Sequence, residues 1–333
     1  WVLQAGDYNV SDDCLDVVAN INGVEKGFVF PIFVDNLTIR GEGDVNITSD
    51  YNPGDSAGGG WNYQNFITIG GSNVTLENLD LEGNPNGYYD NQCNKVIELI
   101  NGKDLTLKDL DLAPIKGSDG KVTSGSIYIN VADAGNTVIE GVTMASWINA
   151  KAVTAEGSTV TVKNTVQDFT NNSYAGYSAE TYGYAWNPGV SGDKVSLENF
   201  TIKVDDKANF VKQISDNLRP GTTVELATDI TVDEMVYIKA ENVTIKGNGH
   251  KITAGDAFKM GNHGQVNLFK VEANDVTLDN INLVATDKNK HTLDVYGSEN
   301  LTLKDVTLDN TNTIGGAPLI NNGSTISVEG KLS

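Results

Sequence analysis

The stretch Asn73–Leu81 reads Asn-Val-Thr-Leu-Glu-Asn-Leu-Asp-Leu and decides the fold. Apolar and polar residues alternate on each side of Asn78, as in two short β-strands, and asparagine tolerates the left-handed backbone of a tight corner between them. Similar stretches return along the chain at Asp104–Leu112, Lys194–Ile202, Asp275–Leu283 and Asn300–Leu308. A unit this short cannot bury its own apolar side, so it must stack on copies of itself. The repeats therefore predict an all-β solenoid.

The spacing of the repeats gives the length of one coil. Motifs that start at residues 136 and 159, and at 275 and 300, are 23 and 25 residues apart, and the longer intervals elsewhere must leave the coil as loops. The strict six-residue repeats of a left-handed hexapeptide helix are absent from the sequence. Because connections between parallel strands favour the right-handed crossover, we predict a right-handed parallel β-helix.

The second part of the chain copies the first, since Val224–Val232 matches Val2–Val10. We therefore predict two tandem β-helices, residues 1–203 and 204–333; a single continuous solenoid is the alternative. Between them a short amphipathic helix is expected over residues 208–218, and such a helix caps the open end of a solenoid. Its apolar face would consist of Phe210, Val211, Ile214 and Leu218.

The chain is strongly acidic, with a formal net charge of −21 and a sequence pI of about 4.4. Such a surface repels nucleic acid and anionic lipid. The longest apolar run, near Phe28–Val34, is far shorter than the ~20 residues of a spanning helix. We therefore expect no nucleic-acid partner and no membrane insertion. Because the chain starts at Trp1 without a methionine, we also expect it to be part of a larger multidomain protein.

Three long insertions in the first part, residues 50–63, 83–93 and 171–188, contain most of the tyrosines, and we call them the aromatic loops. Insertions at equivalent coil positions project from one flank of a solenoid, and aromatic rings beside Asn and Asp suit the binding of sugar rings. The alternative is that these rings fold back and cover the flank of the solenoid. The predicted carbohydrate-binding residues are Tyr51, Trp61, Tyr63, Tyr88, Tyr89, Asp90, Tyr182, Tyr184 and Trp186.

Catalysis has weaker support in the sequence. Glycoside hydrolysis needs two carboxylates ~5 to 9.5 Å apart, and Asp55, Asp90 and Glu180 in the aromatic loops are candidates. A chain with 44 acidic residues supplies such pairs by chance. A lyase would need a basic residue and usually Ca²⁺. The chain has only two arginines; Arg40 is expected in a surface ladder and Arg219 next to the cap helix, which leaves a lysine such as Lys95 as the base. We assign no catalytic residue.

Metal and cofactor motifs are missing from the sequence. The histidines His250, His263 and His291 have no ligand spacing and are expected in turns or on the surface. No EF-hand or phosphate-binding glycine loop occurs. We therefore expect no metal site and no cofactor, and leave open whether acidic corners bind Ca²⁺.

Fold motifs follow one another from Pro220-Gly221 through Asn242–His250 to the Val-Thr-Leu repeats, and this order resembles the pectate-lyase-like β-helix superfamily. It is most similar to the adhesive domains of bacterial surface proteins. Such repeats serve lyases, hydrolases, epimerases, phage spikes and non-catalytic adhesins alike. The resemblance implies extracellular carbohydrate binding at a cell surface or cell wall and transfers no catalytic residue.

These observations favour a surface adhesin that recognises a polysaccharide or glycoprotein glycans, without catalysis. The first alternative is a glycoside hydrolase or polysaccharide lyase that acts in the groove expected between the aromatic loops. A structural spacer or surface-layer element, in which the aromatic residues only pack, is the second.

Overall fold

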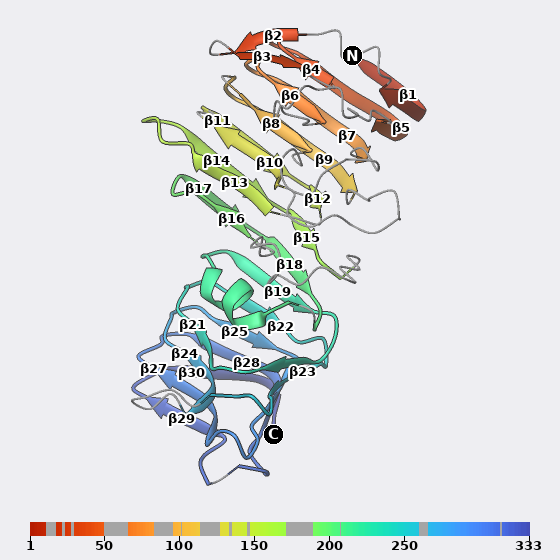
Figure 1. Cartoon of the computed structure of the whole chain (residues 1–333). Helices are drawn as coiled ribbons and strands as arrows, with labels where there is room; N and C mark the ends of the chain where they lie inside the picture. Colours follow the sequence, from red (N-terminus) through yellow and green to blue (C-terminus); the bar gives the residue numbers. More distant parts are fainter. Residues whose placement is uncertain are drawn as a thin grey trace. The chain divides into compact units, whose positions relative to one another are not determined.

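The computed structural model describes residues 1–10, 18–21, 24–27, 30–49, 66–82, 96–100, 102–113, 127–132, 135–144, 147–170, 189–206, 208–259, 266–313 and 315–333. They form two compact units, Trp1–Glu198 and Asn199–Ser333 (Figure 1). Nearly all regular structure in both is parallel β-sheet, so the predicted parallel β-helix is confirmed. The predicted domain boundary after residue 203 stays a prediction, since compactness alone does not test it.

The first unit stacks its coils on two parallel sheets, beside one short antiparallel hairpin formed by β2 (Val18–Ile21) and β3 (Val24–Gly27). The larger sheet contains β1 (Val2–Val10), β5 (Thr38–Ser49), β7 (Thr75–Glu82), β9 (Thr106–Ala113), β11 (Asn136–Glu140), β12 (Thr143–Met144), β14 (Thr159–Lys163), β15 (Val166–Asp168) and β17 (Val195–Glu198). The smaller sheet contains β4 (Phe30–Ile32), β6 (Ile67–Ile69), β8 (Ile97–Leu99), β10 (Ile127–Ala132), β13 (Trp147–Ala152) and β16 (Val190–Ser191).

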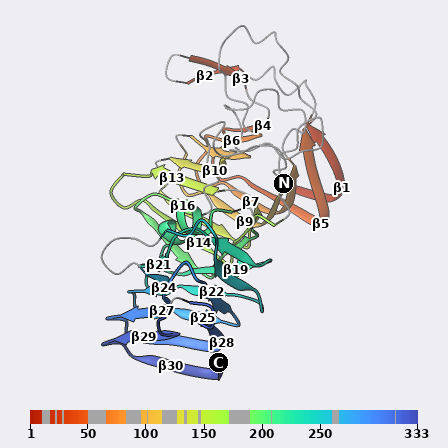
Figure 2. The ribbon, with the colours of Figure 1, turned by 60° about the horizontal axis from the view of Figure 1, so that its bottom comes forward.

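The second unit repeats this arrangement, and Figure 2 shows its strands stacked coil upon coil. Its larger sheet contains β18 (Phe200–Val204), β19 (Thr222–Leu226), β20 (Ile230–Val232), β22 (Thr244–Lys246), β23 (Lys251–Ala254), β25 (Thr277–Asp279), β26 (Asn282–Val284), β28 (Leu301–Asp309) and β30 (Ile326–Leu332). Its smaller sheet contains β21 (Val236–Ile238), β24 (Asn267–Val271), β27 (His291–Tyr296) and β29 (Leu319–Asn322).

Asparagine and aspartate make the corners. Every non-glycine residue with a positive φ in the described part of the chain is Asn or Asp, with φ between +48° and +59°. Equivalent corners of successive coils also bond to each other, because the Asn73 amide donates to Asn36 Oδ1 at 2.8 Å. Asn36, Asn73, Asn242 and Asn300, each of which begins an Asn-x-Thr sequence, thus serve the backbone turn.

The dry interior consists of apolar residues stacked in register. Leu76 pairs with Ile39 on one side and Leu107 on the other, and all three side chains are at most 1% exposed. Burying a side chain of this size contributes roughly 1.5–3 kcal/mol. Because each coil buries its apolar residues only against its neighbours, stacking is what stabilises the fold.

Outside this interior, charges of opposite sign alternate from coil to coil. Lys108 Nζ lies 2.6 Å from Glu77 Oε1, and Lys163 Nζ lies 3.0 Å from Glu140 Oε2. Arg40 belongs to the same row, next to Glu77. In register, the row of the first unit runs Arg40, Glu77, Lys108, Glu140, Lys163, Glu198, and that of the second runs Glu225, Lys246, Asp279, Lys304, Glu329.

The expected helix is shorter than predicted. A π-helical turn, η2 (Phe210–Ile214), continues into a 3₁₀ turn, η3 (Ser215–Asn217), and packs on β20 and β21. Phe210, Val211 and Ile214 are buried as expected. Leu218 does not extend the helical face, because its backbone is already extended two residues before Pro220. None of the helices in the described part of the chain has the length and apolarity that a bilayer crossing requires.

Candidate functional site

The predicted sugar-binding residues of the aromatic loops lie outside the described residues, and so do the candidate carboxylates Asp55, Asp90 and Glu180. Both assignments therefore stay predictions. The described residues bring together a different group of aromatic and charged side chains, on the smaller sheet of the second unit.

This group, which we call the tyrosine face, covers the outer side of the sheet β21–β24–β27–β29. Alternate residues of the strands point inward and are fully buried, as Phe269, Val271 and Val295 illustrate. The register stacks Tyr237, Lys270 and Asp294 in one row, and Tyr296 and Asn322 in another. Figure 2 shows the strands β21, β24, β27 and β29 that carry them, stacked in this order. The aromatic and polar outward residues are Tyr237, Lys239, Lys270, Glu272, Asp294, Tyr296 and Asn322, and Ile320 is the register neighbour of Asp294 on the same side.

Lys270 connects the two tyrosines. Its Nζ lies 4.9 Å from the ring centroid of Tyr237 and 5.3 Å from that of Tyr296. It also pairs with Glu272 Oε2 at 3.0 Å, and that carboxylate accepts a hydrogen bond from the Tyr237 hydroxyl. The second lysine, Lys239, lies 4.3 Å from the Tyr237 centroid. Cation–π contacts therefore hold both rings in place.

Asp294 is held between two amides. Asn267 Nδ2 donates to its Oδ2 at 2.9 Å, and Asn322 Nδ2 donates to its Oδ1 at 3.1 Å. The donors belong to the strands before and after β27, so one carboxylate ties three coils together. Asn267 is buried, and its own Oδ1 has no hydrogen-bond partner among the described residues.

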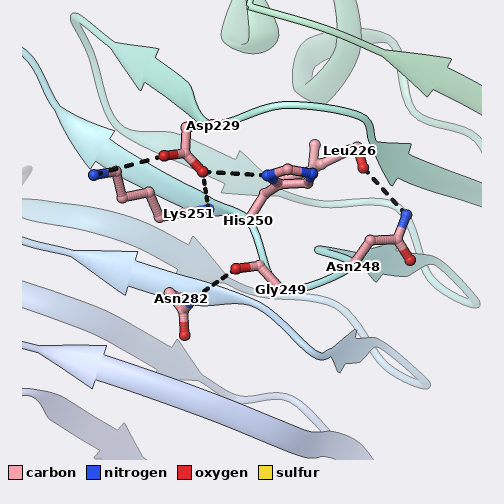
Figure 3. A network of polar contacts seen from close by, with 7 residues as sticks. All are labelled: Leu226, Asp229, Asn248, Gly249, His250, Lys251 and Asn282. Atoms are coloured by element: carbon pink, nitrogen blue, oxygen red, sulfur yellow. Dashed lines mark hydrogen bonds and ion pairs between the residues drawn. The ribbon is translucent and has the colours of Figure 1, made fainter.

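The polar corner in Figure 3 offers different chemistry. Asp229 Oδ1 accepts from the Lys251 backbone N–H at 3.2 Å and lies 3.3 Å from His250 Nδ1, while Lys251 Nζ lies 3.6 Å from Oδ2. These donors and charges, chiefly the Lys251 N–H, lower the pKa of Asp229. Asn248 adds a bond to the Leu226 carbonyl at 3.1 Å. Every one of these contacts joins successive coils, so the corner is suited to holding the stack together.

The remaining histidines and acids do not assemble a metal centre. In the described part of the chain, no three His, Cys, Asp or Glu side chains converge on one point. His291 Nδ1 accepts a hydrogen bond from the Ala317 backbone at 2.9 Å, and His263 lies outside the described residues. Acidic neighbours do occur on the first unit, where Asp80 and Asp111 are stacked in register.

The sequence interpretation missed the tyrosine face. Tyr237 and Tyr296 are the only tyrosines of residues 199–333; Tyr237 lies between the buried Val236 and Ile238, and Tyr296 follows the buried Val295 at the end of its strand. The one feature of the sequence that could have indicated this face is that two single tyrosines occur in a unit otherwise poor in aromatic residues. The clustered tyrosines of the aromatic loops outweighed it.

No protein-family model and no curated protein matches the sequence. Among solved structures, the chain is similar to the A-module of the mannuronan C-5 epimerase AlgE4 of Azotobacter vinelandii, with 13% identity, a TM-score of 0.29, and coverage of 98% of this chain and 90% of that one. It is similar to the AlgE6 A-module of the same organism, with 12% identity, a TM-score of 0.28, and coverage of 100% and 90%. The class of protein, a β-solenoid, follows from the strand pairing itself.

Proposed function

We propose that the protein is a non-catalytic carbohydrate-binding β-helix, displayed outside the cell as an adhesin, which binds a polysaccharide or glycoprotein glycan on the tyrosine face. One observation carries the proposal: Tyr296 is 52% exposed, among amide and charged side chains on a packed sheet. A sugar ring can stack on such an aromatic side chain while its hydroxyls bond to Asn322, Asp294 and Lys270.

The hydrogen bonds of the two carboxylates favour binding over catalysis. Glu272 is engaged by Tyr237 and Lys270, and Asp294 by two amides. A general acid or base must instead present its carboxyl to the reacting group. Carboxylates that are already bonded in this way position their neighbours and accept hydrogen bonds from a bound sugar.

The aromatic loops enter the proposal as a separate contact region of the first unit. Single-site sugar affinities of this kind are weak, and many copies on a cell surface would raise the avidity without any new contact. Neither feature requires a metal ion or a cofactor.

Glycan-array binding with parallel assay of product release tests the proposal. We expect bound glycan without new reducing ends and without unsaturated uronate. Either product would replace the adhesin with a hydrolase or a lyase. If no glycan binds and no product forms, a structural spacer is the correct description.

A further inference from the structure

The two tyrosines of the face differ in what surrounds their rings. The Tyr237 ring is contacted by two lysine ammonium groups, that of Lys239, just after its own strand, and that of Lys270, in the next coil. Its hydroxyl bonds to the Glu272 carboxylate, which also pairs with Lys270. The protein's own lysines and Glu272 thus supply both the ammonium groups and the carboxylate that contact Tyr237.

The Tyr296 ring has only part of that combination. Lys270 of the preceding coil lies over it, but its register neighbour in the next coil is Asn322 rather than a lysine. Two residues earlier on the same strand and the same face stands a carboxylate, Asp294. The exposed Tyr296 thus has a carboxylate on the same face of its strand and no second lysine as a register neighbour.

The carboxylate of Asp294 is positioned and charged to bind a cation. Its carboxylate forms no ion pair within the described residues, and its two hydrogen bonds come from the neutral amides of Asn267 and Asn322. These amides fix its position without cancelling its charge. The ammonium of Lys270, by contrast, is already paired with Glu272 at 3.0 Å.

We infer that Tyr296 and Asp294 form a subsite for the ammonium group of an amino sugar, so that the bound glycan is cationic. The inference rests on the proposed glycan-binding function. The net charge of −21 points the same way, since it attracts cationic chains and repels those rich in uronate or sulfate. A sugar ring stacked on Tyr296 brings its amino group beside Asp294, where cation–π attraction and the carboxylate act together.

Matched oligosaccharides test the inference. Titration calorimetry would compare a β-1,4-linked glucosamine tetramer with its fully N-acetylated counterpart, which has the same backbone but no charge. The wild type is expected to bind the amine form about tenfold more tightly. Asp294→Asn should abolish most of this preference, with the affinity for the amine form falling toward that for the N-acetylated tetramer. Glu329→Gln, which removes one negative charge from another sheet of the same unit, should keep the preference.

The outcomes separate the inference from the function on which it rests. Equal or tighter binding of the N-acetylated tetramer, or of a uronate tetramer, overturns the amino-sugar subsite and leaves glycan binding standing. Equally tight binding of tetralysine also overturns it, because the face would then recognise charge rather than a sugar. If none of the oligosaccharides binds but the array shows another bound glycan, the amino-sugar subsite alone fails; if the array also shows no bound glycan, the proposed function fails as well. A folded Asp294→Asn variant that has lost the preference for the amine form, together with a loss of binding in Tyr296→Ala, supports the inference.

Discussion

Asp111 lies beside Asp80 in the register of β7 and β9, and the pKa of its carboxyl is raised, first by partial burial and then by the charge of Asp80. The pKa of Asp80 is raised too, by partial burial and by Asp44. A carboxyl with a raised folded-state pKa binds its proton more tightly in the folded protein. It therefore costs stability at pH values above that pKa, and the cost disappears as the pH falls through it.

Replacing Asp111 by Asn should accordingly stabilise the protein at neutral pH. The gain should be only a few tenths of a kcal/mol, since solvent screens a partly exposed charge. It should shrink as the pH approaches the ordinary carboxyl value of 3.8. Urea unfolding of wild type and variant across this pH range measures both effects. The control is Asp193→Asn, which changes an exposed residue of the same unit away from Asp80 and Asp111. If Asp111→Asn were less stable than wild type at neutral pH, the argument would be contradicted.

Asp229 should behave in the opposite way. The pKa of Asp229 in the folded protein is lowered, chiefly by the hydrogen bond from the Lys251 backbone N–H. The ionised carboxylate therefore stabilises the protein at pH values above the ordinary pKa of 3.8, and this stabilisation is lost as the pH falls through the lowered pKa. Asp229→Asn should lower the melting temperature at neutral pH, and the two curves should meet in acid. Thermal unfolding as a function of pH, with the exposed Asp256→Asn as control, decides this. A difference that persists unchanged in acid would show that lost packing, and not charge, is responsible.

The left-handed corners predict a simple substitution pattern at Asn280, whose φ is +48°. Alanine at this position should destabilise the protein by about 1–2 kcal/mol, because its Cβ crowds the following carbonyl in this conformation. Glycine should be nearly neutral, since it adopts positive φ without that clash. Denaturant unfolding of the two variants gives the comparison. Equal stability of Asn280→Ala and Asn280→Gly would mean that the corner imposes no strain.

The charge rows predict that exchanging two partners does not restore stability. Glu77 stands between Arg40 and Lys108, and Lys108 between Glu77 and Glu140. Lys108→Glu should lower the melting temperature, and adding Glu77→Lys should fail to recover it, because the introduced lysine would then face Arg40 and the introduced glutamate would face Glu140. The difference should diminish in high salt. Full recovery in the double variant would mean that the two residues act as an isolated pair.

Most of the fold could be predicted from the sequence because each repeat contains the Asn or Asp residue that forms the turn between its two strands. Asn78 and Asp109 sit between two alternating stretches, and each adopts the left-handed backbone that its residue type allows. The end of the cap helix was less readable. Apolar spacing places Leu218 on the helical face, but the turn before Pro220 extends its backbone first.

The tyrosine face could not be predicted in the same way. Tyr237 and Lys270 are register neighbours 33 residues apart in the chain, whereas Lys270 and Asp294 are neighbours only 24 residues apart. Because successive coils differ in length, the sequence does not show which outward side chains become neighbours. Composition led instead to the aromatic loops, and the prediction of a sugar site there is still to be tested.

Titration of one array-selected glycan into wild type, Tyr296→Ala and Tyr8→Ala tests the central claim most directly. Tyr8 is a tyrosine of the first unit, 37% exposed, whose hydroxyl bonds to the Gln4 carbonyl, so it controls for the loss of an exposed ring. We predict that Tyr296→Ala weakens binding about tenfold or more, equivalent to ~1.4 kcal/mol, with an unchanged melting temperature, and that Tyr8→Ala binds like wild type. Unchanged affinity in Tyr296→Ala, above all if Trp61→Ala with Trp186→Ala abolishes binding, would contradict the account and move the site to the aromatic loops.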